Sequence, residues 1–174
     1  MSRNIEIKAR VRDAVAFQQI ASKLATAPVE TLVQCDVFFN ASAGRLKLRI
    51  TEGVSAQLIA YRRADAAGPR TSEYQICEVA DAHSLRTALA MSLGERGEVR
   101  KQRKLFMHGR TRIHLDDVAS LGSFAELEVV LGADEDEAAA YEEAATLMQQ
   151  LDIAQSDLES SAYIDLLGAA RPAV

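Results

Sequence analysis

The chain has 174 residues, which is enough for one domain with a sizeable hydrophobic core and leaves little room for a second. Hydrophobic residues make up 48% and charged residues 26%, a balance that excludes an intrinsically disordered chain. The net charge of −5 argues against broad electrostatic binding to nucleic acid or to an anionic membrane. We therefore expect one domain over residues 1–174 with neither a nucleic-acid nor a membrane partner.

Features that report on the cellular compartment point to the cytoplasm. The N-terminal sequence lacks the apolar run of a signal peptide, and no stretch approaches the ~18 apolar residues of a membrane span. Cys35 and Cys77 are the two cysteines of the chain. Two thiols without a signal peptide fit a reducing compartment better than a disulfide framework. We expect a cytoplasmic protein.

In chain order, the first predicted element is a strand over residues 4–11, where polar and apolar side chains alternate strictly. Asp13 is then a suitable N-cap for a helix over residues 14–24. Further strands are predicted at 33–40, 45–50, 57–63 and 72–79. The short turn between the second and third of these favours a hairpin.

The second half begins with a helix that Asp81 opens and that runs through Ala90. Three more strands are predicted at 97–108, 110–118 and 123–131, and helical segments at 138–151 and 157–167. This order is typical of an α+β fold dominated by antiparallel strands. Roughly seven or eight strands in one domain would close as a barrel or form a curved sheet.

Several predicted strands carry one face that is wholly ionic. Exposure to solvent explains such a face on any single strand. Here the feature recurs, and the faces differ in sign: Glu6 with Lys8 and Arg10; Arg45, Lys47 and Arg49; Lys101 with Arg103; Arg112 with Asp116; Glu126 with Glu128. If helices cover the apolar faces, the ionic faces meet inside a barrel.

Charge gathered inside a barrel is costly unless the charges pair with one another or bind a ligand. A polyanion together with divalent cations would satisfy both signs. Basic side chains would bind phosphate oxygens, and glutamates would bind Mg²⁺ or Mn²⁺. The residues alone leave a second interpretation open, a solvated sheet crossed by salt bridges.

The same segments resemble the CYTH, or triphosphate tunnel metalloenzyme, superfamily. Its N-terminal signature is Glu-x-Glu-x-Lys, and Asn4-Ile5-Glu6-Ile7-Lys8 stands in that place. Within the superfamily the chain is most similar to the class IV adenylyl cyclase group. The stretches that carry this similarity are FFN…GRLKLR (38–49), VRKQRKLF (99–106), GRTRIHLDDVASLGSFAELEVV (109–130) and SAYIDLL (161–167).

The resemblance implies a closed eight-stranded antiparallel β-barrel, a tunnel open at both ends, with helices packed outside. It implies that Glu6, Glu126 and Glu128 bind the metal, Mg²⁺ or Mn²⁺. The side chains that it implies as triphosphate clamps are Lys8, Lys47, Arg49, Arg63, Lys101, Arg103 and Arg112. We add Arg10 and Arg45, which share the ionic faces of their strands.

Catalysis is expected from Glu6, Lys8, Asp116 and Glu126, with Asp116 holding either a metal-bound water or a basic neighbour. Asn4 departs from the signature and brings no charge, so affinity for a second metal should fall. His114 shares a strand face with Asp116, and a hydrogen-bonded structural role is favoured over that of a general base. Tyr163 has two interpretations: packing over one mouth of the tunnel, or anchoring an amphipathic helix in a groove.

Three functions fit these features. A hydrolase of tripolyphosphate, thiamine triphosphate or a nucleoside triphosphate is favoured, because no residues clearly read an adenine. The alternative is a class IV adenylate cyclase that converts ATP to cyclic AMP and pyrophosphate. A non-catalytic module that binds polyphosphate or nucleotide is the third, although such a module gains little from carboxylates without metal. The partner is in every case a triphosphate-bearing small molecule, and exposed helix faces would also allow a homodimer.

Overall fold

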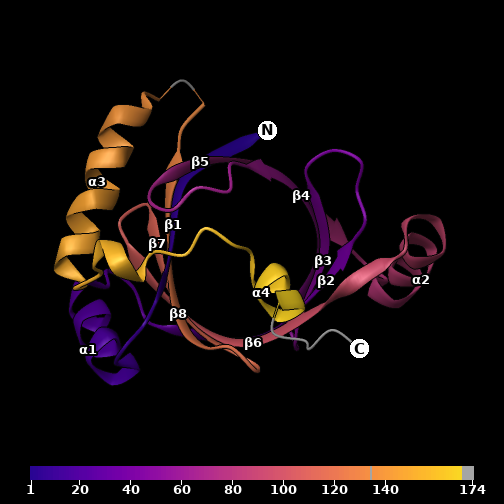
Figure 1. Ribbon diagram of the computed structural model, residues 1–174, viewed down its shortest axis with the longest axis horizontal. Helices are drawn as coiled ribbons and strands as arrows, with labels where there is room; N and C mark the ends of the chain where they lie inside the picture. Colours follow the sequence, from indigo (N-terminus) through magenta and orange to yellow (C-terminus); the bar gives the residue numbers. More distant parts are fainter. Residues whose placement is uncertain (134, 170–174) are drawn as a thin grey trace.

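The computed structural model describes residues 1–133 and 135–169, so residues 134 and 170–174 of the predicted domain lie outside the described part. Its central feature is a closed barrel of eight antiparallel strands (Figure 1). In chain order the strands are β1 (Ser2–Arg10), β2 (Glu30–Phe39), β3 (Arg45–Thr51), β4 (Ser55–Arg63), β5 (Arg70–Val79), β6 (Glu95–His108), β7 (Thr111–Val118) and β8 (Gly122–Leu131). Around the barrel the order is β1-β5-β4-β3-β2-β6-β7-β8, and β1 closes it by pairing with β8. The predicted barrel is confirmed.

Within the described residues, four α-helices lie against this barrel. They are α1 (Ala14–Leu24), α2 (Ala82–Leu93), α3 (Glu137–Gln150) and α4 (Tyr163–Ala169). Figure 1 shows α1 and α3 on one side of the barrel and α2 on the opposite side. Asp13 caps α1 as predicted, because its carboxylate accepts hydrogen bonds from the backbone of Val15 and Ala16. None of these helices is long and apolar enough to cross a membrane.

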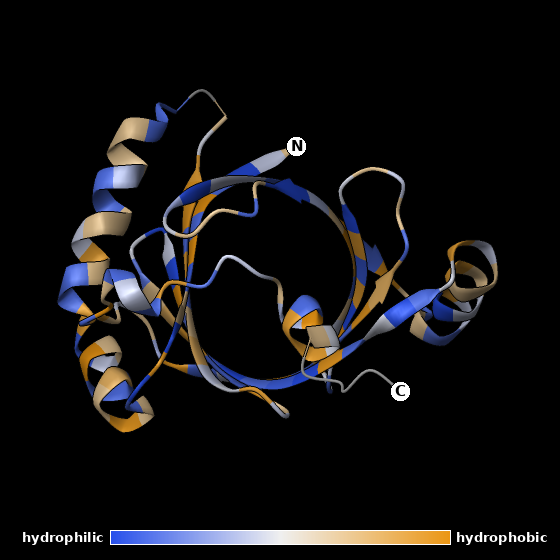
Figure 2. Ribbon diagram, viewed as in Figure 1, coloured by the Kyte–Doolittle hydropathy of each residue, from blue (hydrophilic) through white to orange (hydrophobic). Residues whose placement is uncertain are grey.

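On β1, β6, β7 and β8 the alternation separates a largely apolar outer face from an inner face that carries charged side chains. Figure 2 shows it as blue and orange segments that follow one another along the strands. On β1, Ile5 and Ile7 are almost fully buried and pack in the core under α1 and α3. Glu6 and Lys8 point the other way and line the interior. The period of two therefore places the core outside the barrel and the charges within it.

The C-terminal segment crosses one end of the barrel. Leu158 pairs with Ala9, and the N–H of Glu159 donates a hydrogen bond of 2.9 Å to the carbonyl of Lys8. The predicted helix over 157–167 is therefore wrong at its start, because Leu158 and Glu159 pair with the end of β1 and helix α4 begins only at Tyr163.

The helix α4 then covers this end of the barrel, and Figure 1 shows it within the outline of the ring. Tyr163 and Ile164 are buried against side chains that point inward from the barrel strands, namely Phe38, Val99, Val118 and Phe124. Tyr163 packs over this mouth of the tunnel, the first of its two interpretations.

Candidate functional site

The inner faces of the strands enclose a cavity of about 330 Å³, a size typical of small-molecule sites. Seven basic side chains line it: Lys8, Lys47, Arg49, Arg63, Lys101, Arg103 and Arg112. Four carboxylates line it with them: Glu6, Asp36, Glu126 and Glu128. The interior thus carries an excess of positive groups, although the chain as a whole is acidic. Such an interior attracts anions.

A network of ion pairs centres on Arg103. Its Nε and Nη2 donate to the two oxygens of Asp116, each over 2.6 Å, and Nη2 also lies 2.6 Å from Glu126 Oε2. Lys101 Nζ adds a bond of 3.2 Å to Asp116. Burial alone would raise the pKa of Asp116, but Arg103 and Lys101 outweigh burial and lower this pKa to about 2.

Asp116 is 0% exposed and does not line the cavity. Besides the two basic groups it accepts a hydrogen bond of 3.1 Å from the hydroxyl of Tyr163. Of the two roles expected for it, the structure therefore favours holding basic neighbours. Asp116 is placed as a positioning residue behind the cavity wall.

A second carboxylate, Asp36, plays the same part on strand β2, which is adjacent to β6, and was missed by the sequence analysis. It is 2% exposed and accepts hydrogen bonds of 2.9 Å from Lys47 and of 2.7 and 2.8 Å from Arg49. These two cations hold the pKa of Asp36 well below its usual value, against the opposing effect of burial. The available signal was the position of Asp36 on the same strand face as Gln34, next to the apolar run of residues 37–39.

Glu6 and Lys8 face the cavity from neighbouring positions of β1. Glu6 Oε1 lies 3.3 Å from Arg63 Nε and 3.1 Å from Arg70 Nε. Lys8 Nζ lies 3.4 Å from Glu126 Oε1 and 4.1 Å from the centre of the Tyr163 ring. Arg70, the first residue of β5, is a member of this group that the strand patterns did not single out.

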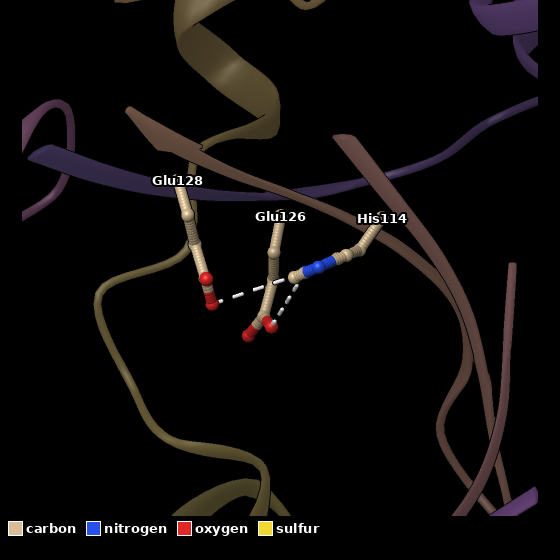
Figure 3. Close-up of side chains that lie close together, drawn as sticks. All are labelled: His114, Glu126 and Glu128. Atoms are coloured by element: carbon tan, nitrogen blue, oxygen red, sulfur yellow. Dashed lines mark ion pairs between the residues drawn. The ribbon is translucent and has the colours of Figure 1, made fainter. Parts of the chain in front are cut away.

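The structure brings together three side chains that are able to hold a metal ion. His114, Glu126 and Glu128 each offer one donor atom, and these atoms lie within 4.8 Å of one another (Figure 3). His114 is 3% exposed, and its Nδ1 has no hydrogen-bond partner among the described residues. The expectation of a hydrogen-bonded His thus fails at this nitrogen. Burial and the nearby Arg103 lower the pKa of His114 to about 4.

Two of the three predicted metal ligands, Glu126 and Glu128, belong to this group. Glu6 does not belong to it, and no other such group exists among residues 1–133 and 135–169. Carboxylate oxygens and an imidazole nitrogen are common ligands of divalent ions, so these residues fit a metal. A bound ion would find its ligands on β7 and β8, two adjacent strands.

Another part of the cavity wall is apolar and aromatic. It consists of Leu32, Ile59, Tyr61, Tyr74, Ile76 and Leu105, with the amides of Gln34 and Gln57 among them. The cavity reaches solvent near this wall, where Ile76 is 39% exposed and the side chain of Arg112 is 39% exposed. A ligand in the cavity would contact basic side chains on one side and apolar or aromatic side chains on the other.

Residues 2–163 of this chain match the model of the CYTH domain. The chain belongs to the CYTH family. Its fold is similar to that of solved structures from three organisms. The PH1012 protein of Pyrococcus horikoshii OT3 has 20% identity and a TM-score of 0.81, over 94% of this chain and 98% of that one.

A candidate adenylate cyclase from Vibrio parahaemolyticus has 21% identity and a TM-score of 0.74, over 95% of this chain and 97% of that one. The candidate adenylyl cyclase HpAC1 from Hippeastrum is described as having a dominant triphosphatase activity. It has 16% identity and a TM-score of 0.67, over 98% of this chain and 97% of that one. At these identities the likeness shows the fold alone. A comparison with curated proteins found no match.

Two predicted clamp residues lie apart from the cavity of this CYTH barrel. Arg10 has a side chain that is 52% exposed and pairs with Glu159 over 3.4 Å. Arg45 binds Asp65 over 2.8 Å and lies 3.5 Å from Asp165 of α4. Neither arginine lines the cavity. Both sit where the C-terminal segment crosses the barrel end, and their partners belong to that segment or to the loop after β4.

Proposed function

We propose that this CYTH protein is a divalent-metal-dependent hydrolase of a triphosphate substrate, which is tripolyphosphate, thiamine triphosphate or a nucleoside triphosphate. The observation that carries the proposal is the cavity itself, whose seven basic groups surround a possible metal site. A triphosphate needs cations along its chain of oxygens and a metal beside the phosphorus that is attacked. The cavity offers both within one enclosed space.

The clamp would act through two anchored pairs of cations. Asp116 fixes Arg103 and Lys101, and Asp36 fixes Arg49 with Lys47 in the same way. Because each pair is held before the substrate binds, little reorganisation is needed when charge develops on the phosphate oxygens. Arginine adds the planar fork that matches two oxygens at once.

Glu126 and Glu128, with His114 beside them, would hold the metal, and the metal would supply polarisation of the phosphoryl group. Glu6 and Asp36, the other two lining carboxylates, both pair with cations, but the side chain of Glu6 is 21% exposed and that of Asp36 is 3% exposed. We assign Glu6 the task of orienting the attacking water. Lys8, between Glu126 and Tyr163, would neutralise charge on the leaving oxygen.

The alternative, a class IV adenylate cyclase, would use the same cations on ATP but direct the ribose hydroxyl at the α-phosphorus. The similar fold of the Vibrio candidate cyclase supports it, and the dominant triphosphatase activity described for HpAC1 supports the hydrolase. Gln34 and Gln57 are lining amides that would have to read the base. Hydrolysis demands no such reader and is preferred.

The remaining parts of the proposal concern context. A cytoplasmic location agrees with the free thiols of Cys35 and Cys77. We treat residues 1–174 as a single triphosphate tunnel domain that acts on a small molecule, without a nucleic-acid or membrane partner. A homodimer is compatible with the exposed helix faces.

The test is a product assay in Mg²⁺ or Mn²⁺ with tripolyphosphate, thiamine triphosphate and ATP offered in parallel. The proposal expects release of orthophosphate without cyclic AMP. Cyclic AMP with pyrophosphate would establish the alternative, and no turnover with either metal would indicate a binding module. Glu126→Gln should lose turnover and keep the fold, whereas Glu142→Gln, which alters an exposed carboxylate of α3, should keep both.

A further inference from the structure

The metal group of this chain includes a nitrogen donor that a carboxylate site lacks. We propose that His114 Nδ1 is a metal ligand, and that the site formed with Glu126 and Glu128 prefers Mn²⁺ and similar transition-metal ions over Mg²⁺. The inference deepens the proposed function and rests on it for its catalytic meaning. Its physical basis lies in three observations on the side chains drawn in Figure 3.

The first observation is the position of the ring. The pairing of β7 with β8 sets His114 directly opposite Glu126, and Glu128 follows two residues further along the same face. Figure 3 shows the edge of the ring turned toward both carboxylates. Three donors on two paired strands are held by the sheet register and not by a loop. Such a site is largely formed before an ion binds.

The second observation is the unused nitrogen. His114 is 3% exposed, and Nδ1 is buried without a hydrogen-bond partner among the described residues. Both carboxylates lie 3.9 Å from it, which is beyond hydrogen-bond distance. Two ligands that each bind one ion at about 2.1 Å are at most about 4.2 Å apart, so 3.9 Å suits a shared ion. An ion would give this buried nitrogen the partner that it lacks among the described residues.

The third observation concerns Glu6, the ligand that the family signature predicts. Its Oε1 is bound by Arg63 and Arg70, and Glu6 stands outside the metal group. Glu126 and Glu128 also pair with cations, Glu126 with Arg103 and Glu128 with Arg112, but each keeps an oxygen 3.9 Å from His114 Nδ1. The donor set that the structure assembles is therefore one nitrogen and two carboxylates, in place of three carboxylates.

This exchange of donor changes which ion is favoured. Mg²⁺ is a hard ion that takes oxygen ligands and dehydrates reluctantly. An imidazole nitrogen binds first-row transition-metal ions better than it binds Mg²⁺, and the affinity rises from Mn²⁺, at the low end of the series, to Cu²⁺. A site with one imidazole and two carboxylates should therefore separate Mn²⁺ from Mg²⁺ more strongly than a site built of carboxylates.

The experiment is a titration of the full chain with Mn²⁺ or Mg²⁺ in the absence of any triphosphate, followed by pulsed EPR of the Mn²⁺ complex. The chain has three His residues, so His83→Gln, which changes an exposed ring at the start of α2, is a matched control for His114→Gln. We expect ¹⁴N coupling from a bound imidazole in the wild type and in His83→Gln. In His114→Gln the coupling should vanish, and the Kd for Mn²⁺ should rise at least about tenfold while that for Mg²⁺ changes less.

Absence of ¹⁴N coupling in the wild type would overturn the inference, and so would an unchanged Kd for Mn²⁺ in a folded His114→Gln. The wild-type spectrum tests the inference by itself, so the test remains valid even if a variant fails to fold. The two proposals also fail separately. If Mn²⁺ binds through nitrogen but no triphosphate is hydrolysed, the proposed function is wrong and this inference stands. If a triphosphate is hydrolysed but nitrogen does not coordinate Mn²⁺, this inference is wrong and the proposed function stands.

Discussion

Arg103 and Asp116 face each other across β6 and β7, and the two hydrogen bonds that join guanidinium and carboxylate are both 2.6 Å long. The carboxylate lies behind the cavity wall, while the arginine lines the cavity. A cation held in this way keeps its orientation whether or not an anion is bound. The same ion pair therefore stabilises the barrel and holds Arg103 in the orientation that binds an anion.

Asp116→Asn should destabilise the fold by about 3 kcal/mol, because Arg103 and Lys101 lose the buried charge that they share and Arg103 keeps only Glu126 as a charged partner. The pKa of Asp116 is lowered from 3.8 to about 2, so its stabilising effect is complete above about pH 4 and is lost as the pH falls toward 2. Urea unfolding at neutral pH and melting curves between pH 5 and pH 2 measure both effects. Asp117→Asn changes the exposed neighbour on the outer face and should be nearly neutral; equal losses in the two variants would contradict the assignment.

The affinity for a triphosphate should fall as the pH rises through about 8. Burial and the neighbouring Arg49 lower the pKa of Lys47 to about 8, so this cation is present below that pH and is lost above it. Calorimetric titration with tripolyphosphate across this range measures the change. Lys47→Arg keeps its charge throughout and should abolish the inflection. An inflection of the same size in that variant would place its origin elsewhere.

Alternation along the strands was sufficient to predict which side chains face inward. Glu126 and Glu128 on β8, and Lys101 with Arg103 on β6, line the cavity as the period of two requires. The same period put Arg10 on the inner face of its strand, but it cannot give the height of a residue along the barrel axis. That height depends on the stagger between strands, a property of long-range pairing.

Other features of the site arise only from tertiary structure. The role of Asp36 depends on the pairing of β2 with β3, which brings Lys47 and Arg49 within hydrogen-bond distance of its carboxylate. His114 Nδ1 has no hydrogen-bond partner in the part of the chain that the structure describes, and no sequence pattern reports such an absence. Residues 158–162 were predicted as helix because local propensity says nothing of the hydrogen bond to Lys8.

Detachment of α4 should follow from Asp165→Arg. Asp165 pairs with Arg96 and lies 3.5 Å from Arg45, and a third arginine would turn these attractions into repulsion. We expect amide hydrogen exchange in residues 163–169 to become faster while the strands keep their protection. Glu142→Arg, an exposed site on α3, is the control for added charge. Unchanged exchange in Asp165→Arg would mean that apolar packing alone holds the helix.

The apolar wall of the cavity leads to a prediction about the substrate. Ile76 offers no group that binds phosphate, whereas an organic group attached to a triphosphate would bury itself against this side chain and the ring of Tyr74. Ile76→Ser should weaken the binding of ATP or thiamine triphosphate by about tenfold, which is the loss of roughly 1.4 kcal/mol of apolar contact. Tripolyphosphate has no such group, and its affinity should be unchanged. Val54→Ser, at an exposed turn outside the cavity, is the matched control. Equal losses for tripolyphosphate and the organic triphosphates in Ile76→Ser would show that this wall does not select the substrate.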